Sequence, residues 1–207
     1  MTSNSPARQQ ERIARSAEQP LVSGLPNAPG IVAAMQLSPE LGSNLRALAD
    51  TLLVHPFPES SLTRFESELI ATRVSAANNC FFCMDSHAKH AEAIAECEGI
   101  DRAEAMTEAI KVGSSEELSP KLTGLLRVAL NVQGLVQDNE QETQAVQSAL
   151  EAGATPGDIH HTVAIAAAFS MYNRLVEGFR AMTPSNTGVY DERAAQIAQH
   201  GYQLPLQ

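Results

Sequence analysis

Two cysteines and a histidine at helical spacing are the residues of this chain that are best suited to chemistry. Cys80, Cys83 and His87 are separated by three and four residues, so on a helix they lie along one stripe. The two sulfur atoms are then within reach of a disulfide across the first turn, and Cys83 faces the same way as His87. A cysteine pair with this spacing is typical of dithiol–disulfide exchange or of metal binding.

The expected position of the pair at the start of a helix favours redox chemistry. Unpaired backbone N–H groups and the helix dipole stabilise a thiolate there, and a nearby imidazole can take the thiol proton. A peroxide converts such a thiolate to a sulfenic acid, which a second cysteine one turn away condenses with before over-oxidation. Glu68 lies on the preceding predicted helix and faces partly inward, so it needs a partner that His87 or a thiol can supply.

A metal site is the alternative that these residues leave open. His87 and His90 share the predicted helix with the cysteines, so a site with two cysteines and two histidines is conceivable, but one helix rarely wraps four ligands around one ion. We therefore expect neither a metal nor a cofactor. Cys97 lies fourteen residues beyond Cys83, too far along the helix to join the pair, and is expected to be a buried small side chain.

Helices packed on helices must position these groups. The chain has 207 residues, of which 43% are hydrophobic, and it lacks Trp while Ala and Leu are abundant. Periodicity and breakers predict about eight helices and no sheet. Counting a short helix at the start, the expected ranges are 31–35, 39–54, 61–77, 80–97, 101–112, 119–136, 140–152, 155–182 and 189–200.

One helix start is repeated along the chain. Ser38-Pro39 is a predicted N-cap with proline at the first helical position, and the surrounding 37–41 pentapeptide recurs 81 residues later as Leu118-Ser119-Pro120-Lys121-Leu122. We interpret this repeat as evidence that the chain consists of two related halves, of which only the first kept the cysteines. The alternative is that the repeat arose by chance and from shared capping preferences. Two details accompany it. Ser60 or Ser61 should cap the helix that carries Glu68, and the inward stripe of the first repeated helix should hold Leu41, Leu45, Leu48 and Leu52.

Charge and composition exclude several classes of function. A formal net charge of −10 argues against binding to nucleic acid, which needs clustered Lys and Arg. No run of 18 apolar residues is present to span a membrane, and the polar N-terminus lacks the apolar core of a signal peptide, so a cytoplasmic location is expected. Residues 1–20 are expected to be a flexible arm, and residues 21–207 a single helical domain.

The reactive residues resemble a known signature. Glu68, eleven residues, Cys80, two residues, Cys83, three residues and His87 is similar to the pattern of the AhpD-like alkylhydroperoxidases, in the carboxymuconolactone decarboxylase superfamily. Tyr172-Asn173-Arg174 resembles the peroxidase-related branch, and the resemblance covers about residues 20 to 185. It implies an all-α AhpD-like fold in which Cys83 attacks a peroxide, Cys80 resolves the product, and His87 with Glu68 relays the proton. Phe82 departs from the founding members, which carry histidine immediately before the second cysteine.

The resemblance also implies a function and its partners. We expect a thiol-dependent peroxidase that reduces hydroperoxides, takes electrons from a dithiol reductant protein, and forms a homo-oligomer (a dimer, trimer or hexamer). The alternative is a non-catalytic helical protein that senses redox state or is clipped by a metal. His160 and His161 open the last long helix and should cap it or lie at the surface; the alternative is that one of them approaches the active site from the second half. Tyr172 and Asn173 should anchor helix packing or a subunit contact.

Overall fold

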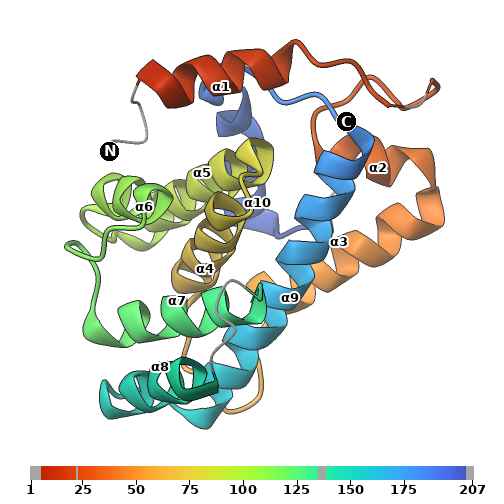
Figure 1. Cartoon of the computed structure of the whole chain (residues 1–207). Helices are drawn as coiled ribbons and strands as arrows, with labels where there is room; N and C mark the ends of the chain where they lie inside the picture. The colour runs from red at the N-terminus through yellow and green to blue at the C-terminus, as the bar shows by residue number, and fades with distance from the viewer. Residues whose placement is uncertain (1–5, 22, 135–138, 204–207) are drawn as a thin grey trace.

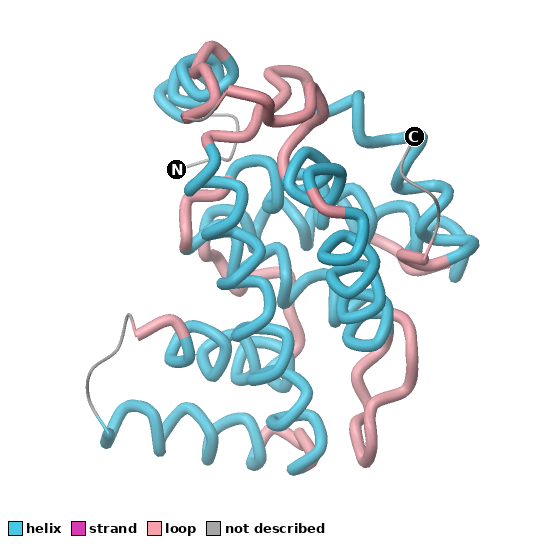
Figure 2. The backbone as a smooth tube through the Cα atoms, turned by 90° about the vertical axis from the view of Figure 1, so that its right-hand side faces the viewer, coloured by secondary structure: helices cyan, strands magenta, loops and turns pink. Residues whose placement is uncertain are grey.

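The chain is built entirely from helices. The computed structural model describes residues 6–21, 23–134 and 139–203, which form ten α-helices and one short 3-10 helix and contain no strand (Figure 1, Figure 2). This confirms the predicted all-α class, with one helix at the N-terminus that the sequence did not predict. The helices are α1 (Pro6–Ser16), α2 (Ile31–Leu37), α3 (Pro39–Leu53), α4 (Arg64–Ala77), α5 (Phe81–Glu98), α6 (Ala103–Val112), α7 (Pro120–Val132), α8 (Asn139–Glu151), α9 (Pro156–Phe179), the 3-10 helix η1 (Thr187–Tyr190) and α10 (Asp191–His200).

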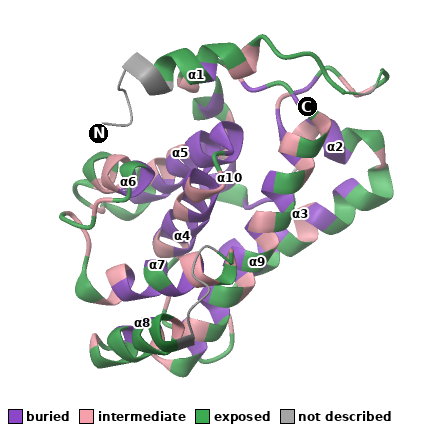
Figure 3. Cartoon of the chain, viewed as in Figure 1, coloured by how far each residue is buried: buried purple, intermediate pink, exposed green. Residues whose placement is uncertain are grey.

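Helix α4 lies at the centre of the molecule. It is buried on nearly all sides, and α3, α5, α6, α7 and α9 surround it (Figure 3). The helix begins at Thr63, whose side chain accepts the backbone N–H of Glu66 while Glu66 accepts that of Thr63, so the predicted cap at Ser60 or Ser61 was wrong. Those two serines bind the carboxylate of Asp158 instead, because this buried charge needs donors.

Both copies of the repeated helix start form the predicted cap. The hydroxyl of Ser38 accepts the backbone N–H of Leu41 at the start of α3, and that of Ser119 accepts the backbone N–H of Leu122 at the start of α7. That the two halves of the chain are related remains a prediction.

The stripe predicted for α3 is only half buried. Leu45 and Leu52 lie in the core, whereas Leu41 and Leu48 are 42% and 38% exposed. The stripe therefore straddles the edge of the buried face, with one of its two rows inside. Helical period alone gives the direction of an apolar stripe and not how far the neighbouring helices cover it.

The N-terminal segment differs from its prediction, because residues 6–16 form the helix α1, which lies across α5 (Figure 1). Charge holds it there: the buried guanidinium of Arg12 donates to both carboxylate oxygens of Asp85, each at 3.1 Å, and lies over the ring of Phe81. This helix lacks the apolar period by which the other helices can be predicted from the sequence. The division of the chain into residues 1–20 and 21–207 remains a prediction.

The last turn of α5 leaves the core. Cys97 is exposed there, which corrects its predicted burial, since nothing packs over the final turn before Gly99 ends the helix. None of the helices in the described ranges is long and apolar enough to cross a membrane.

Candidate functional site

A tight turn between α4 and α5 places the cysteine pair. Asn78 ends α4, Asn79 adopts a left-handed conformation with φ 56°, and the backbone N–H of Cys80 donates to the carbonyl of Ser75 at 3.0 Å. Helix α9 fixes this turn through Asn173, which accepts from the side-chain amide of Asn78 at 2.9 Å and donates to the hydroxyl of Ser75 at 3.1 Å. Asn173 therefore anchors α9 against the end of α4, which is one of the two roles expected for it.

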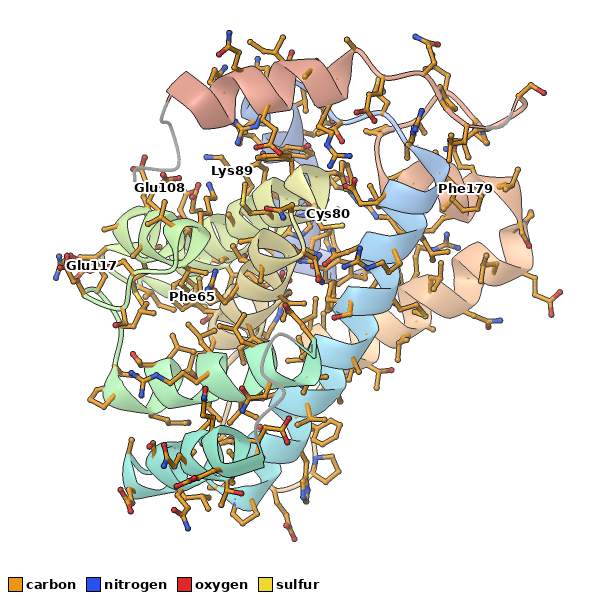
Figure 4. The ribbon with its side chains drawn as sticks, viewed as in Figure 1. Phe65, Cys80, Lys89, Glu108, Glu117 and Phe179 are labelled. Carbon is orange, nitrogen blue, oxygen red and sulfur yellow. The ribbon has the colours of Figure 1, made fainter. Side chains whose placement is uncertain are left out.

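The two thiols have different surroundings. Cys80, labelled in Figure 4, is the N-cap of α5 and is fully buried near α9. Cys83, in the first turn, lines a cavity of about 430 Å³, and Cys80 is not among the residues that line it. Both are free thiols in this structure. A hydrogen bond with the Cys83 side chain, together with burial, raises the pKa of the Cys80 thiol. Cys83 is thus the thiol that a ligand in the cavity can meet, and Cys80 is a protonated thiol behind it.

Glu68 and His87 form a buried pair, as their spacing suggested. The Nδ1 atom of His87, on α5, lies 2.7 Å from Oε2 of Glu68 on α4. Burial alone would raise the pKa of Glu68, but the charge and hydrogen bond of His87, reinforced by His90, lower it to about 2. Since an ionised carboxylate only accepts, His87 carries its proton on Nδ1. In the neutral form of this imidazole, Nε2 is then the nitrogen that can accept a proton, and His87 lines the same cavity as Cys83.

Two residues at this pair were not expected from the sequence. The hydroxyl of Tyr202 donates to Oε1 of Glu68 at 2.6 Å, and Nδ1 of His90 lies 2.9 Å from that hydroxyl. Burial lowers the pKa of His90, against the opposing effect of Glu68, so it is a neutral imidazole. His90 had been considered only as a metal ligand. Nothing local marks Tyr202, which lies 134 residues from Glu68 and is held by its backbone N–H to Asp50.

The side chains that could hold a cation in the structure differ from the two cysteines and two histidines that the sequence suggested as a possible metal site. Within the described ranges, the set of three or more side chains suited to a metal is Glu68, His87 and His90, whose ligand atoms lie within 4.8 Å of one another. Neither cysteine belongs to it. The arrangement of two cysteines and two histidines on one helix is therefore not formed.

Aromatic and apolar side chains shape the rest of the cavity. Phe82 lines it and meets the ring of Tyr190 edge to face, with 5.6 Å between the ring centroids. Gly30 permits this position, because a Cβ atom there would lie 2.1 Å from the Phe82 ring. Tyr172 also lines the cavity, and its hydroxyl donates to the carbonyl of Leu45 at 2.7 Å.

The two histidines at the start of α9 lie elsewhere. His160 is exposed, as expected for a surface residue. His161 is buried, stacks on Phe57 and bonds to the carbonyl of Leu52 at 2.6 Å, so it holds the loop before α4. Neither lines the cavity that contains Cys83.

The lowered pKa of Glu68 predicts a specific loss of stability in acid. Between pH 4.5, its ordinary pKa, and about 2, the unfolded chain binds a proton at this group that the folded chain does not, so stability falls as the pH falls. The shift corresponds to about 3 kcal/mol. Urea unfolding at a series of pH values should show this loss in the native protein and not in Glu68→Gln, with the exposed Glu40→Gln as control. An unchanged pH dependence in Glu68→Gln would contradict the assignment.

Comparisons with known proteins agree with this fold. Residues 39–131 match the model of the carboxymuconolactone decarboxylase family. A structure described as the alkylhydroperoxidase AhpD core, an uncharacterized peroxidase-related protein from Ralstonia eutropha JMP134, is 21% identical with a TM-score of 0.61, over 92% of this chain and 90% of its own. An uncharacterized peroxidase-related protein from Silicibacter sp. TM1040 is 18% identical with a TM-score of 0.59, over 85% of this chain and 93% of its own. No curated protein matches the chain.

Proposed function

We propose that this chain, in which residues 39–131 match the carboxymuconolactone decarboxylase family, is a thiol-dependent peroxidase that reduces hydroperoxides through a cycle of Cys83 and Cys80. The observation that carries the proposal is that the two thiols of the site have different surroundings. Cys83 opens on the cavity together with His87, and Cys80 lies buried one turn behind it. A binding cavity, an attacking thiol and a resolving thiol are the parts that such a cycle needs.

The first step is attack on the peroxide. Nε2 of His87 takes the proton of Cys83, while Glu68 holds the imidazole by its Nδ1 atom and stabilises the imidazolium. The Cys83 thiolate attacks the terminal oxygen of the hydroperoxide, the O–O bond breaks, and Cys83 becomes a sulfenic acid. The departing alkoxide takes a proton from the imidazolium and leaves as an alcohol.

The second step forms the disulfide. The raised pKa of Cys80 keeps it a protonated thiol until the sulfenic acid is present. Its sulfur then bonds to the sulfur of Cys83, and the hydroxyl group leaves with the thiol proton as water. A dithiol reductant protein returns both cysteines to thiols and is itself oxidised to a disulfide. The cycle needs no metal or cofactor.

Peroxide consumption in the presence of a dithiol tests the proposal. The protein with dithiothreitol should consume cumene hydroperoxide catalytically, with cumyl alcohol as the product. The competing function is that of a non-catalytic helical protein that a bound metal ion stabilises. It is supported by the cluster of Glu68, His87 and His90, whose side chains could hold such an ion. That function predicts stoichiometric metal binding and no turnover. If the protein consumed no peroxide catalytically and held one cation tightly per chain, the metal-binding function would be favoured over the peroxidase.

We also predict self-association. Leu41 and Leu48 are exposed on one face of α3, and Val163 and Met171 on one face of α9. Exposed apolar side chains along a helix face are typical of a contact surface, and the superfamily resemblance implies a dimer, trimer or hexamer. Light scattering should give two, three or six times the chain mass of 22.1 kDa, and Leu41→Asp with Leu48→Asp should lower that multiple. A monodisperse monomer of the native protein would contradict the prediction.

A further inference from the structure

Two arginines and no acidic residue line the cavity at Cys83. Arg46 of α3 and Arg193 of α10 both line it, and both are half-buried. None of the other residues that line the cavity is Asp or Glu, although the chain as a whole has a net charge of −10. The remainder of the wall is mostly apolar, formed by residues such as Ile31, Val32, Met35, Val189 and Ile197.

Neither arginine has a carboxylate partner among the residues that the structure describes. Arg193 makes a long contact of 3.4 Å with Gln196, and no ion pair forms at Arg193 or Arg46. Asp50, one turn from Arg46, already accepts the backbone N–H of Tyr202 at 2.7 Å and lies 3.0 Å from Nε2 of His55. Within the described ranges, the two arginine side chains therefore lie in a partly buried wall without an ion-pair partner.

The two charges also act on each other. Burial lowers the pKa of Arg193, and the positive charge of Arg46 lowers it further. Burial raises the pKa of Tyr202 well above its usual value, so this neighbour is a neutral phenol and supplies no anion. Like charges that are brought together and partly desolvated are unfavourable unless an anion joins them, and guanidinium groups suit a carboxylate because their parallel N–H groups match its two oxygens.

The thiol and the arginines line one cavity whose wall is mostly apolar. Cys83 packs in an apolar cluster with Phe82 and Tyr190. Ala49 and Ile197, one turn from Arg46 and Arg193 respectively, belong to the main core cluster instead. A ligand in this cavity meets mostly apolar side chains, and the volume of about 430 Å³ lies within the range of about 300–1,000 Å³ for small-molecule sites.

We infer that the substrate is an apolar chain that bears a hydroperoxide and ends in a carboxylate, such as a fatty-acid hydroperoxide, with its carboxylate bound between Arg46 and Arg193 and its hydroperoxide at Cys83. This rests on the proposed function. The carboxylate takes no part in the reaction: the O–O bond breaks at Cys83, the product is the hydroxy acid and water, and the dithiol reductant supplies both electrons. Its role is to fix which end of the molecule reaches the thiol.

The activity test compares an acid with its ester. Linoleic acid hydroperoxide should be reduced with a kcat/KM about 10- to 100-fold above that of its methyl ester, as expected for hydrogen bonds to a charged group. In Arg46→Gln with Arg193→Gln this ratio should approach one, mainly through a higher KM for the acid. Arg127→Gln, an exposed arginine of α7 outside the cavity, should keep the ratio. A ratio near one in the native protein, which requires no variant, would overturn the inference.

A binding measurement separates this inference from the proposed function. Calorimetric titration of the reduced protein with oleate and with methyl oleate involves no peroxide, so it does not depend on turnover. Tight binding of oleate alone, lost in the double arginine variant and kept in Arg127→Gln, would support the carboxylate site even if the protein reduced no peroxide. Equal binding of acid and ester, or oleate binding that survives loss of both arginines, would overturn it even if the protein proved to be a peroxidase.

Discussion

Replacing Cys83 with serine should abolish peroxide reduction. Cys83 is the cysteine that lines the cavity, whereas Cys80 is fully buried behind it, so a hydroperoxide in the cavity has no other thiol to meet. Without the thiolate, the peroxide reacts only slowly and without catalysis. The rate of peroxide consumption should therefore fall to the rate measured with the dithiol and no protein. Steady-state consumption of cumene hydroperoxide measures this.

The matched changes at the other two cysteines separate the roles. Cys80→Ser should carry out one reduction per chain and then stop, with a sulfenic acid on Cys83 that dimedone traps. Cys97→Ser, at the exposed end of α5, should behave as the native protein. Sulfenic acid on Cys80 in the Cys83→Ser protein would reverse the assignment of the attacking thiol.

Removing Glu68 or His87 should slow the reaction of Cys83 by about 10²–10⁴-fold near neutral pH, the usual contribution of a general base. The two side chains are joined at 2.7 Å in a buried setting, so they act as a unit, and the double variant should lose little more than the worse single one. The measurement is the rate of iodoacetamide alkylation of Cys83 against pH in Glu68→Gln, His87→Ala and the double variant. Each profile should move to higher pH.

His160→Ala provides the control for this series, because His160 is exposed and lies outside the cavity. Losses that add in the double variant would mean that the two groups act independently. If the profile of His87→Ala were unchanged, the start of α5 alone would activate the thiol. Phe82, in place of a second imidazole beside Cys83, leaves no substitute base at that position.

The parts of the site that one or two neighbouring helices determine could be predicted from the sequence. Cys83 and His87 share one side of α5 as helical period predicts, although Cys80 lies outside the helix as its extended N-cap. Glu68 meets His87 because a tight turn folds α4 against α5. The starts of α3 and α7 were predictable for the same reason, since a serine followed by proline fixes its cap locally.

The remaining parts depend on contacts between distant segments. Tyr202 reaches Glu68 from beyond α10, and Arg46 and Arg193 reach one cavity from helices at opposite ends of the chain. Contacts between residues so far apart in the chain cannot be predicted from hydrophobic periodicity or from the spacing of a motif. The helix α1 was missed for a related reason: it docks through the ion pair of Arg12 with Asp85, 73 residues away, and not through an apolar face.

One turnover of the reduced protein, without added reductant, tests the proposed cycle most directly. One equivalent of cumene hydroperoxide, mixed with protein whose thiols are reduced, should yield one equivalent of cumyl alcohol and a single disulfide that peptide mass spectrometry places between Cys80 and Cys83, with Cys97 still a free thiol. Unreacted peroxide beside two intact thiols, or alcohol formed while both Cys80 and Cys83 remain reduced, would contradict a cycle that runs on this pair.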